Sequence, residues 1–146
     1  MRWKLISEAT ERTFVVVLDQ GDEVMHSLQH FLREQHVTAA RVSAIGAFRK
    51  AELAFFDPVQ KVYVPIYCGQ QVEALSCLGD VTAEAGHPKL HLHAVVGRRD
   101  GTALGGHLVS AEVYPTFEVM IVESPAYLQR VFDPAVGLSL IQLPAD

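Results

Sequence analysis

The sequence feature that most constrains the fold lies at residues 86–108, which read GHPKLHLHAVVGRRDGTALGGHL. His91 and His93 stand two residues apart in an apolar run typical of a β-strand. Because side chains in a strand alternate between its two faces, both imidazoles should point to the same side. Asp100-Gly101 is a strong turn signal, so the chain is predicted to reverse there. The returning strand would then place His107 beside the first two histidines.

Three imidazoles that meet at one point indicate a metal site. Neutral imidazole nitrogens bind Zn²⁺, and a site with three histidines leaves one coordination position open for water or a ligand. Ca²⁺ and Mg²⁺ prefer oxygen ligands, so His91, His93 and His107 favour zinc or another transition metal. The alternatives are a hydrogen-bonded polar cluster and three unrelated histidines.

Other residues of the same segment leave more than one interpretation open. His87 precedes Pro88, whose ring restricts its backbone, so we expect His87 in a loop, with a role as fourth metal ligand as the alternative. Gly105-Gly106 permits positive φ or close backbone approach, or simply forms a flexible turn. Arg98-Arg99 could bind an anion at the turn, but exposed turn arginines are usually only solvated, which is what we expect.

Length and composition predict one globular domain spanning residues 1–146. Hydrophobic residues make up 49% of the chain and charged residues 20%, so it has the material for a substantial core. Its 12 Lys and Arg against 17 Asp and Glu give a net charge of −5. This balance argues against a broad basic surface for nucleic acid, although a local basic patch stays possible.

The sequence also predicts a cytoplasmic protein that does not enter a membrane. Its first residues, MRWKLISEAT, lack the apolar run of a signal peptide, and no apolar run of about 18 residues is available for a transmembrane helix. Cys68 and Cys77 do not make a disulfide framework. They fit a reducing compartment as small buried side chains.

Hydrophobic periodicity predicts many strands and one clear helix. Apolar residues repeat at helical spacing over residues 23–35, with Asp22 as the expected N-cap and with His26 and His30 on the solvated face. A second, short helix is expected at residues 126–131. Together these elements predict an α+β fold with a largely antiparallel β-sheet packed with one or two helices. Strands are predicted at residues 2–6, 11–18, 37–47, 51–56, 61–67, 71–78, 89–97, 112–122 and 138–143.

One longer run resembles a known family. Residues 91–121, HLHAVVGRRDGTALGGHLVSAEVYPTFEVMI, are similar to the signature of the plants-and-prokaryotes-conserved (PPC) domain, which has an H-x-H strand, a D-G turn, G-G-H-L and then a strand ending in T-x-E-V. Residues 42–57, VSAIGAFRKAELAFFD, and residues 72–82, VEALSCLGDVT, resemble two further segments of that family. The resemblance covers most of the chain, from about residue 11 to residue 143.

The resemblance implies several properties. The fold would be a PPC-like α+β sheet domain that assembles as a homotrimer, and His91, His93 and His107 would be the family histidines that bind a metal, zinc first. Glu73 and Glu118 match acids that recur in the family. Plant members join the domain to AT-hook motifs and act as nuclear regulators, and free-standing bacterial members are named DNA-binding proteins by analogy. This sequence contains no Arg-Gly-Arg-Pro motif and no basic arm.

Two functions follow as hypotheses. The first is a free-standing, metal-binding homotrimer with a regulatory or scaffolding role, associated with DNA through partners. The second is a zinc-dependent hydrolase or lyase acting on a small anionic substrate, with Glu118 or Glu73 as the acid or base and Arg98 as the anion contact. Glu118 would otherwise orient a histidine or lie exposed at an interface. A cupin barrel also carries H-x-H, but Gly97 and Arg98 stand where a cupin would have its glutamate.

Overall fold

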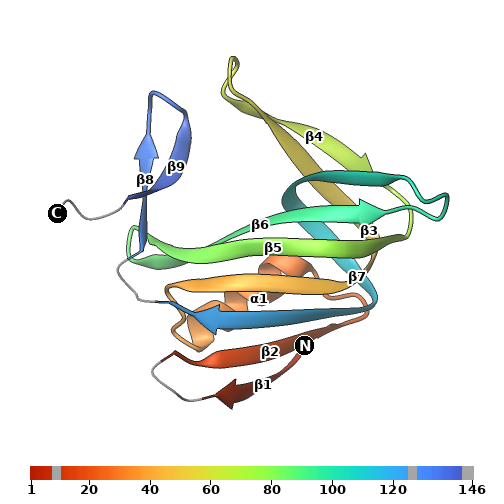
Figure 1. Ribbon diagram of the computed structural model, residues 1–146, viewed down its shortest axis with the longest axis horizontal. Coiled ribbons are helices and arrows are strands. Elements are labelled where there is room, and N and C mark those ends of the chain that lie inside the picture. The colour runs from red at the N-terminus through yellow and green to blue at the C-terminus, as the bar shows by residue number, and fades with distance from the viewer. Residues whose placement is uncertain (8–10, 125–127, 143–146) are drawn as a thin grey trace.

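The computed structural model describes residues 1–7, 11–124 and 128–142, which form one β-sheet of nine strands and one α-helix. Figure 1 shows long central strands with α1 packed against one side and two hairpins, β3–β4 and β8–β9, standing out from them. The predicted antiparallel sheet is confirmed, and the helix is a minor part of the fold. The elements are β1 Arg2–Ser7, β2 Thr13–Asp19, α1 Val24–Glu34, β3 Ala40–Asp57, β4 Val62–Cys68, β5 Val72–Glu84, β6 His87–Gly97, β7 Ala103–Glu123, β8 Gln129–Asp133 and β9 Leu138–Gln142.

Four strands of the sheet pair in a closed circuit. β3 pairs with both β7 and β5, β5 pairs with β6, and β6 pairs back to the beginning of β7. β7 is 21 residues long and pairs with β3 along most of its length, while β2 pairs with its C-terminal half and β6 with its first residues. This closure places His107 directly opposite His93 in the sheet register.

The helix closes the core on one face of the sheet. Its buried residues are Val24, Leu28, Phe31 and Leu32, and the Phe31 ring meets the Phe14 ring of β2 edge-on at 5.3 Å between centroids. Burying side chains of this size stabilises the fold by roughly 1.5–3 kcal/mol each. The N-cap is Glu23, whose carboxylate accepts a hydrogen bond from the backbone N of His26, rather than the predicted Asp22. His26 and His30 are exposed, as expected.

Two predicted strand ends lie inside longer strands. The strands predicted at residues 37–47 and 51–56 merge into the single strand β3, which begins at Ala40, because Gly46 adopts a φ of +152° at a register shift instead of starting a turn. The strand predicted at residues 71–78 continues to Glu84 as β5. Gly79 leaves room for the backbone oxygen of His91 on the neighbouring strand, so this glycine serves a close strand contact and not a turn.

The hairpin β6–β7 forms as predicted. The backbone N of Gly101 donates to the carbonyl of Arg98 at 3.0 Å, and Gly101 takes the positive φ of +84° that this turn requires. β7 begins earlier than the predicted strand at residues 112–122 and includes the histidine of the return segment. His87 is the first residue of β6 and not a loop residue, since the restriction imposed by Pro88 favours extended backbone.

The C-terminal hairpin β8–β9 replaces the predicted helix at residues 126–131. Residues 125–127 lie outside the described ranges, and residues 129–131 are in β8. Asp133 makes the turn between the two strands, because its carboxylate accepts from the backbone N of Ala135 and its carbonyl accepts from Gly137. This turn chemistry outweighs a weak local helical pattern. β8 joins β5 through one parallel bridge, Ala83–Gln129.

Both cysteines are buried, as expected, and burial raises the pKa of the Cys77 thiol to about 12. None of the helices in the described ranges has the length and apolar character needed to cross a membrane.

Candidate metal centre

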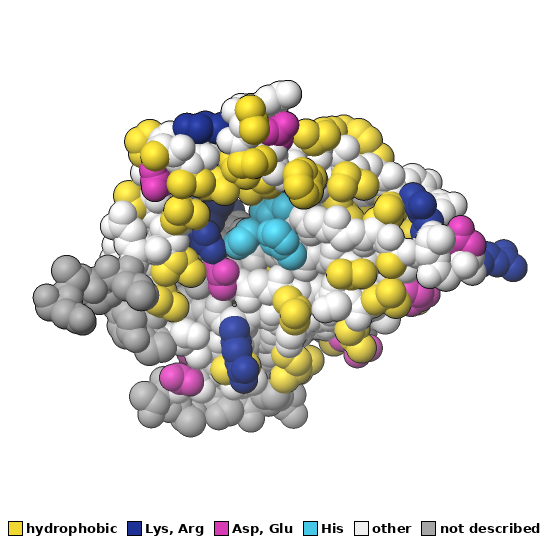
Figure 2. Space-filling model, turned by 45° about the horizontal axis from the view of Figure 1, so that its top comes forward, with side chains coloured by type: hydrophobic (Ala, Val, Ile, Leu, Met, Phe, Trp, Pro, Cys, Tyr) yellow, Lys and Arg dark blue, Asp and Glu magenta, His cyan; other side chains and the backbone are white. Residues whose placement is uncertain are grey.

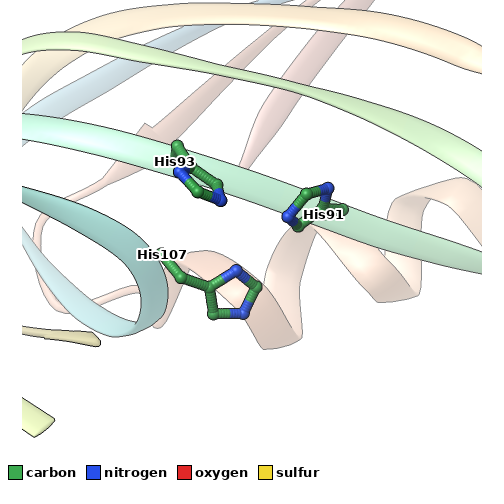
Figure 3. Close-up of side chains that lie close together, drawn as sticks. All are labelled: His91, His93 and His107. Atoms are coloured by element: carbon green, nitrogen blue, oxygen red, sulfur yellow. The ribbon is translucent and has the colours of Figure 1, made fainter. Parts of the chain in front are cut away.

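Three histidines converge at the junction of β6 and β7. One nitrogen from each of His91, His93 and His107 lies within 4.8 Å of the others, and the ring centroids are 5.0–5.5 Å apart. Figure 3 shows two rings from one strand and the third from its neighbour turned toward a common space. The period of two along β6 and the cross-strand pairing of His93 with His107 produce this arrangement, as the sequence predicted.

A glycine beside His107 lets a third strand approach the centre. A side chain at Gly106 would place its Cβ 2.7 Å from the backbone oxygen of Ala54 in β3, whereas a Cβ at Gly105 would make only ordinary contacts from 3.5 Å. Neither glycine has a positive φ. Close backbone approach is therefore the role of Gly106, and it fixes the position of β7 next to His107.

The surroundings of His93 and His107 favour the neutral imidazole that metal binding needs. Burial, together with the neighbouring His91 and His93, lowers the pKa of His107 to about 4. Burial followed by the charge of His91 also lowers the pKa of His93. The Nδ1 atom of His107 is buried without a hydrogen-bond partner among the described residues. An unpartnered, neutral imidazole nitrogen facing two others fits a transition-metal ion.

Asp80 and Arg130 contact the Nδ1 atom of His91. Asp80 Oδ2 lies 3.6 Å from His91 Nδ1, and Arg130 Nη2 lies 3.1 Å from the same atom. Arg130 Nη2 also donates to both oxygens of Asp80, at 2.9 and 3.1 Å. Burial raises the pKa of Asp80, but the neighbouring His91 and the hydrogen bonds from Arg130 outweigh it, so that pKa lies below its ordinary value. With Nδ1 engaged, Nε2 is the nitrogen that His91 has left for a metal.

The sequence prediction missed both of these residues. Asp80 pairs with His91 across the β5–β6 hairpin, so the register counted back from the turn at residues 85–86 would have found it. The predicted strand ended at residue 78, so Asp80 was left outside it and this pairing was not considered. Arg130 had no comparable signal, because its segment was predicted to be helical.

The histidines border a cavity of about 740 Å³. Its walls include Phe55, Phe56 and Tyr63 of β3 and β4 on one side and Phe132 of β8 on the other. The Tyr63 ring lies 4.9 Å from the His107 ring, centroid to centroid. In Figure 2 the histidines lie at a hollow bordered by hydrophobic side chains, with basic and acidic groups beside it. A metal held here would face a largely apolar space with charge at its edge.

The other candidate residues lie elsewhere. Glu73 and Glu118 are exposed and together line a separate groove with Gly46, and neither is among the residues lining the histidine cavity. Arg98-Arg99 does not line that cavity either; Arg99 is exposed, whereas Arg98 Nε is buried without a hydrogen-bond partner among the described residues. His87 is exposed, pairs with Glu84 and is not part of the histidine cluster.

Comparisons with known proteins agree with this fold. The chain matches the Plants and Prokaryotes Conserved (PCC) domain over residues 6–125. A metal-containing protein from Archaeoglobus fulgidus is 34% identical, with 97% of each chain covered and a TM-score of 0.84. A "putative DNA binding protein" from Bacteroides thetaiotaomicron is 26% identical, with 96% of each chain covered and a TM-score of 0.86.

A PPC protein from Pyrococcus horikoshii shares the fold at 24% identity, with a TM-score of 0.85 over 99% of this chain and 96% of that one. No curated protein matches the sequence. The family match covers most of the chain and includes the histidine hairpin, so this chain belongs to the plants-and-prokaryotes-conserved (PPC) domain family.

Proposed function

We propose that this chain binds one transition-metal ion through His91, His93 and His107, with zinc as the favoured candidate. The observation that carries the proposal is the convergence of three imidazole nitrogens within 4.8 Å of one another. The unpartnered Nδ1 of His107 supports it, because a buried polar atom without a partner is costly unless something satisfies it. The similar protein from Archaeoglobus fulgidus is named a metal-containing protein.

In the first functional hypothesis the metal stabilises a homotrimer with a regulatory or scaffolding role that associates with DNA. Support for an assembly comes from the sheet face opposite α1, where large apolar side chains are exposed. Exposed apolar patches of this kind commonly mark protein interfaces. The similar Bacteroides protein is named a "putative DNA binding protein". The exposed residues are Ile45, Leu75, Leu78, Val95 and Met120.

The decisive experiment combines metal analysis with mass measurement. Purified protein should carry close to one metal ion per chain and migrate as a trimer in native mass spectrometry. His91→Ala and His107→Ala should lose the metal. Metal content that is unaffected by either substitution would contradict the proposal, and a monomeric mass would remove the trimer from it.

DNA association has its own test. Because the net charge is −5, we expect DNA to be bound weakly by the chain alone and mainly through partners. Fluorescence anisotropy with a duplex at two salt concentrations distinguishes the cases. Tight binding that falls steeply with salt would show a direct basic interface and contradict association through partners.

The cavity favours a second candidate, a zinc-dependent hydrolase or lyase for a small anionic substrate. The space of about 740 Å³ beside the histidines has Arg130 and Lys89 in its lining, which suits an anion. A bound zinc would polarise an oxygen ligand or activate water near neutral pH. Asp80 lies 3.6 Å from His91 and Glu84 lines the cavity, whereas Glu73 and Glu118 line a separate groove.

The enzyme hypothesis is tested with model esters. Zinc-loaded protein should hydrolyse 4-nitrophenyl acetate or 4-nitrophenyl phosphate faster than His93→Ala does under the same conditions. Equal rates for the two proteins would count against a hydrolase.

A further inference from the structure

We propose that Asp80 and Arg130 are positioning residues for His91, and that through them metal binding is coupled to the docking of the C-terminal hairpin β8–β9. The inference rests on the proposed metal site and adds a structural response to metal binding, the docking of the hairpin. Asp80 lies on β5 and Arg130 on β8, so the two residues join the sheet, the histidine and the hairpin.

Asp80 and Arg130 make opposite demands on His91 Nδ1. A carboxylate only accepts hydrogen bonds, so Asp80 pairs with the tautomer that carries its proton on Nδ1. A guanidinium only donates, so the 3.1 Å contact from Arg130 Nη2 suits the tautomer with its proton on Nε2. Each tautomer of His91 therefore has a partner in the same small cluster.

Metal binding selects one of these tautomers. A neutral His91 that gives Nε2 to a metal must carry its proton on Nδ1, where Asp80 is the acceptor that the described residues supply for its hydrogen bond. Arg130 Nη2 then gives up its contact with His91 and keeps its two contacts with Asp80. We expect the Asp80–His91 distance to shorten from 3.6 Å and the Arg130–His91 distance to lengthen from 3.1 Å on metal binding.

Arg130 also ties the hairpin to the sheet through its side chain. Its Nε donates to Thr82 Oγ1 of β5 at 3.0 Å, and its Nη1 donates to the carbonyl of Ser139 in β9 at 2.9 Å. The backbone adds one bridge to β5 and a 3.2 Å hydrogen bond from Ala83 N to Leu128 O. At the hairpin tip, the exposed Lys61 Nζ donates to Pro134 O.

The docked hairpin in turn favours the metal-binding state. With Arg130 donating to both of its oxygens, the Asp80 carboxylate is held beside His91 and can orient the ring. If docking raises metal affinity in this way, metal must strengthen docking by the same factor. Because Phe132 and Leu140 of the hairpin line the cavity, the metal would also order one wall of the space that it faces.

The test compares this cluster with a matched ion pair remote from it. Arg12 donates from Nε to Glu123 at 2.7 Å and from Nη2 to the carbonyl of Gln35, far from the histidines. Co²⁺ affinity, followed by visible absorbance, should fall roughly 10–100-fold in Asp80→Asn and in Arg130→Met, as for loss of other outer-shell partners. Arg12→Met should bind Co²⁺ as the wild type does, and Arg130→Lys should recover part of the loss.

Two readouts separate positioning from general stability. Long-range ¹⁵N NMR of the zinc-loaded wild type should place the His91 proton on Nδ1. Zinc should also slow amide hydrogen exchange at residues 129–142 in wild type and in Arg12→Met, but not in Arg130→Met. Unchanged affinity in both Asp80→Asn and Arg130→Met, or hairpin exchange that zinc does not alter in wild type, would overturn the coupling while leaving the metal site intact. A wild type that binds no Co²⁺ would instead overturn the proposed function itself.

Discussion

Two arginine–carboxylate pairs in this protein use the same chemistry for different ends. Arg12 and Glu123 join the beginning of β2 to the end of β7, and the remaining hydrogen bond of Arg12 goes to the carbonyl of Gln35 after α1. Arg130 and Asp80 join β8 to β5, and Arg130 also contacts Thr82, Ser139 and His91. Both pairs are partly buried, with side-chain exposures of 34% and 18% in the first and 11% and 33% in the second.

The difference is that the further partner of Arg12 is a backbone carbonyl, whereas one of the further partners of Arg130 is the imidazole of His91. A backbone carbonyl only accepts, so the Arg12 network has one arrangement and acts as a fixed tie between strand and helix. An imidazole has two tautomers, so the Arg130 network has two arrangements that a metal can choose between. The Arg12–Glu123 pair is therefore a structural link. The Arg130–Asp80 pair can respond to a bound metal, because His91 lies beside it.

The largest expected effect is loss of metal-dependent stability when a ligand is removed. At a free zinc concentration 100 times the dissociation constant, bound metal should stabilise the wild type by about 2.7 kcal/mol. His93→Ala should lose nearly all of this gain, whereas Glu123→Gln should keep it. Chemical denaturation with and without zinc measures both. An equal zinc-induced gain in His93→Ala and wild type would show that the metal binds elsewhere.

The two regions should also respond to acid in different pH windows. Burial lowers the pKa of His107 to about 4 from an unfolded value of 6.5, so the unfolded metal-free chain binds the proton first and stability is lost as pH falls from about 6.5 to about 4. The hydrogen bond from Arg12 lowers the pKa of Glu123 below 4.5, so its contribution is present above 4.5 and lost on further acidification.

Denaturation of metal-free protein at a series of pH values separates the two windows. His107→Asn should flatten the profile between about pH 6.5 and 4, and Glu123→Gln should flatten it only below about 4.5. Identical profiles for His107→Asn and wild type above pH 4.5 would contradict the burial of a neutral His107.

A smaller effect is expected from crowding the histidine end of β7 alone. Gly106→Ala puts a Cβ against the backbone of Ala54, and overpacking of this kind typically costs about 1–3 kcal/mol. Gly105→Ala is the matched control, since its Cβ meets only ordinary contacts. Metal affinity should fall in Gly106→Ala because His107 moves with the strand, and it should stay unchanged in Gly105→Ala. Equal behaviour of the two variants in denaturation and Co²⁺ titration would rule out the close approach as a requirement.

The smallest effect on metal affinity should come from Glu118 and Glu73, the acids that the sequence suggested as a catalytic acid or base. Glu118→Gln and Glu73→Gln change exposed groups in a separate groove, so Co²⁺ affinity should stay within about twofold of wild type, far from the roughly 10–100-fold loss expected for Asp80→Asn. A loss in Glu118→Gln as large as in Asp80→Asn would place Glu118 in the metal environment after all.

The local pattern predicted the histidine cluster because a strand period, a turn and a return are all short-range properties. His91 and His93 share a face by the pleat of one strand, and the Asp100-Gly101 turn sets the return of His107. The antiparallel sheet, the helix at residues 24–34 and the solvated His26 and His30 followed from the same kind of reasoning.

What the sequence prediction missed depends on how strands pair with one another, both within a hairpin and between segments far apart in the chain. Gly46 and Gly79 are glycines of the kind that often end strands, yet both lie within strands that bend or pass close to a neighbour. Asp80 was therefore left outside its strand, and its pairing with His91 was lost with it. Arg130 reaches the site only because β8 docks on β5, a contact that no local periodicity encodes.

X-ray absorption at the zinc edge of the loaded protein tests the central claim most directly. Three imidazoles on one ion predict one zinc per chain with nitrogen neighbours at about 2.0–2.1 Å and multiple-scattering features of imidazole. Those features should disappear in His93→Ala. A sulfur shell near about 2.3 Å, or a zinc environment that is the same in His93→Ala as in wild type, would contradict the account.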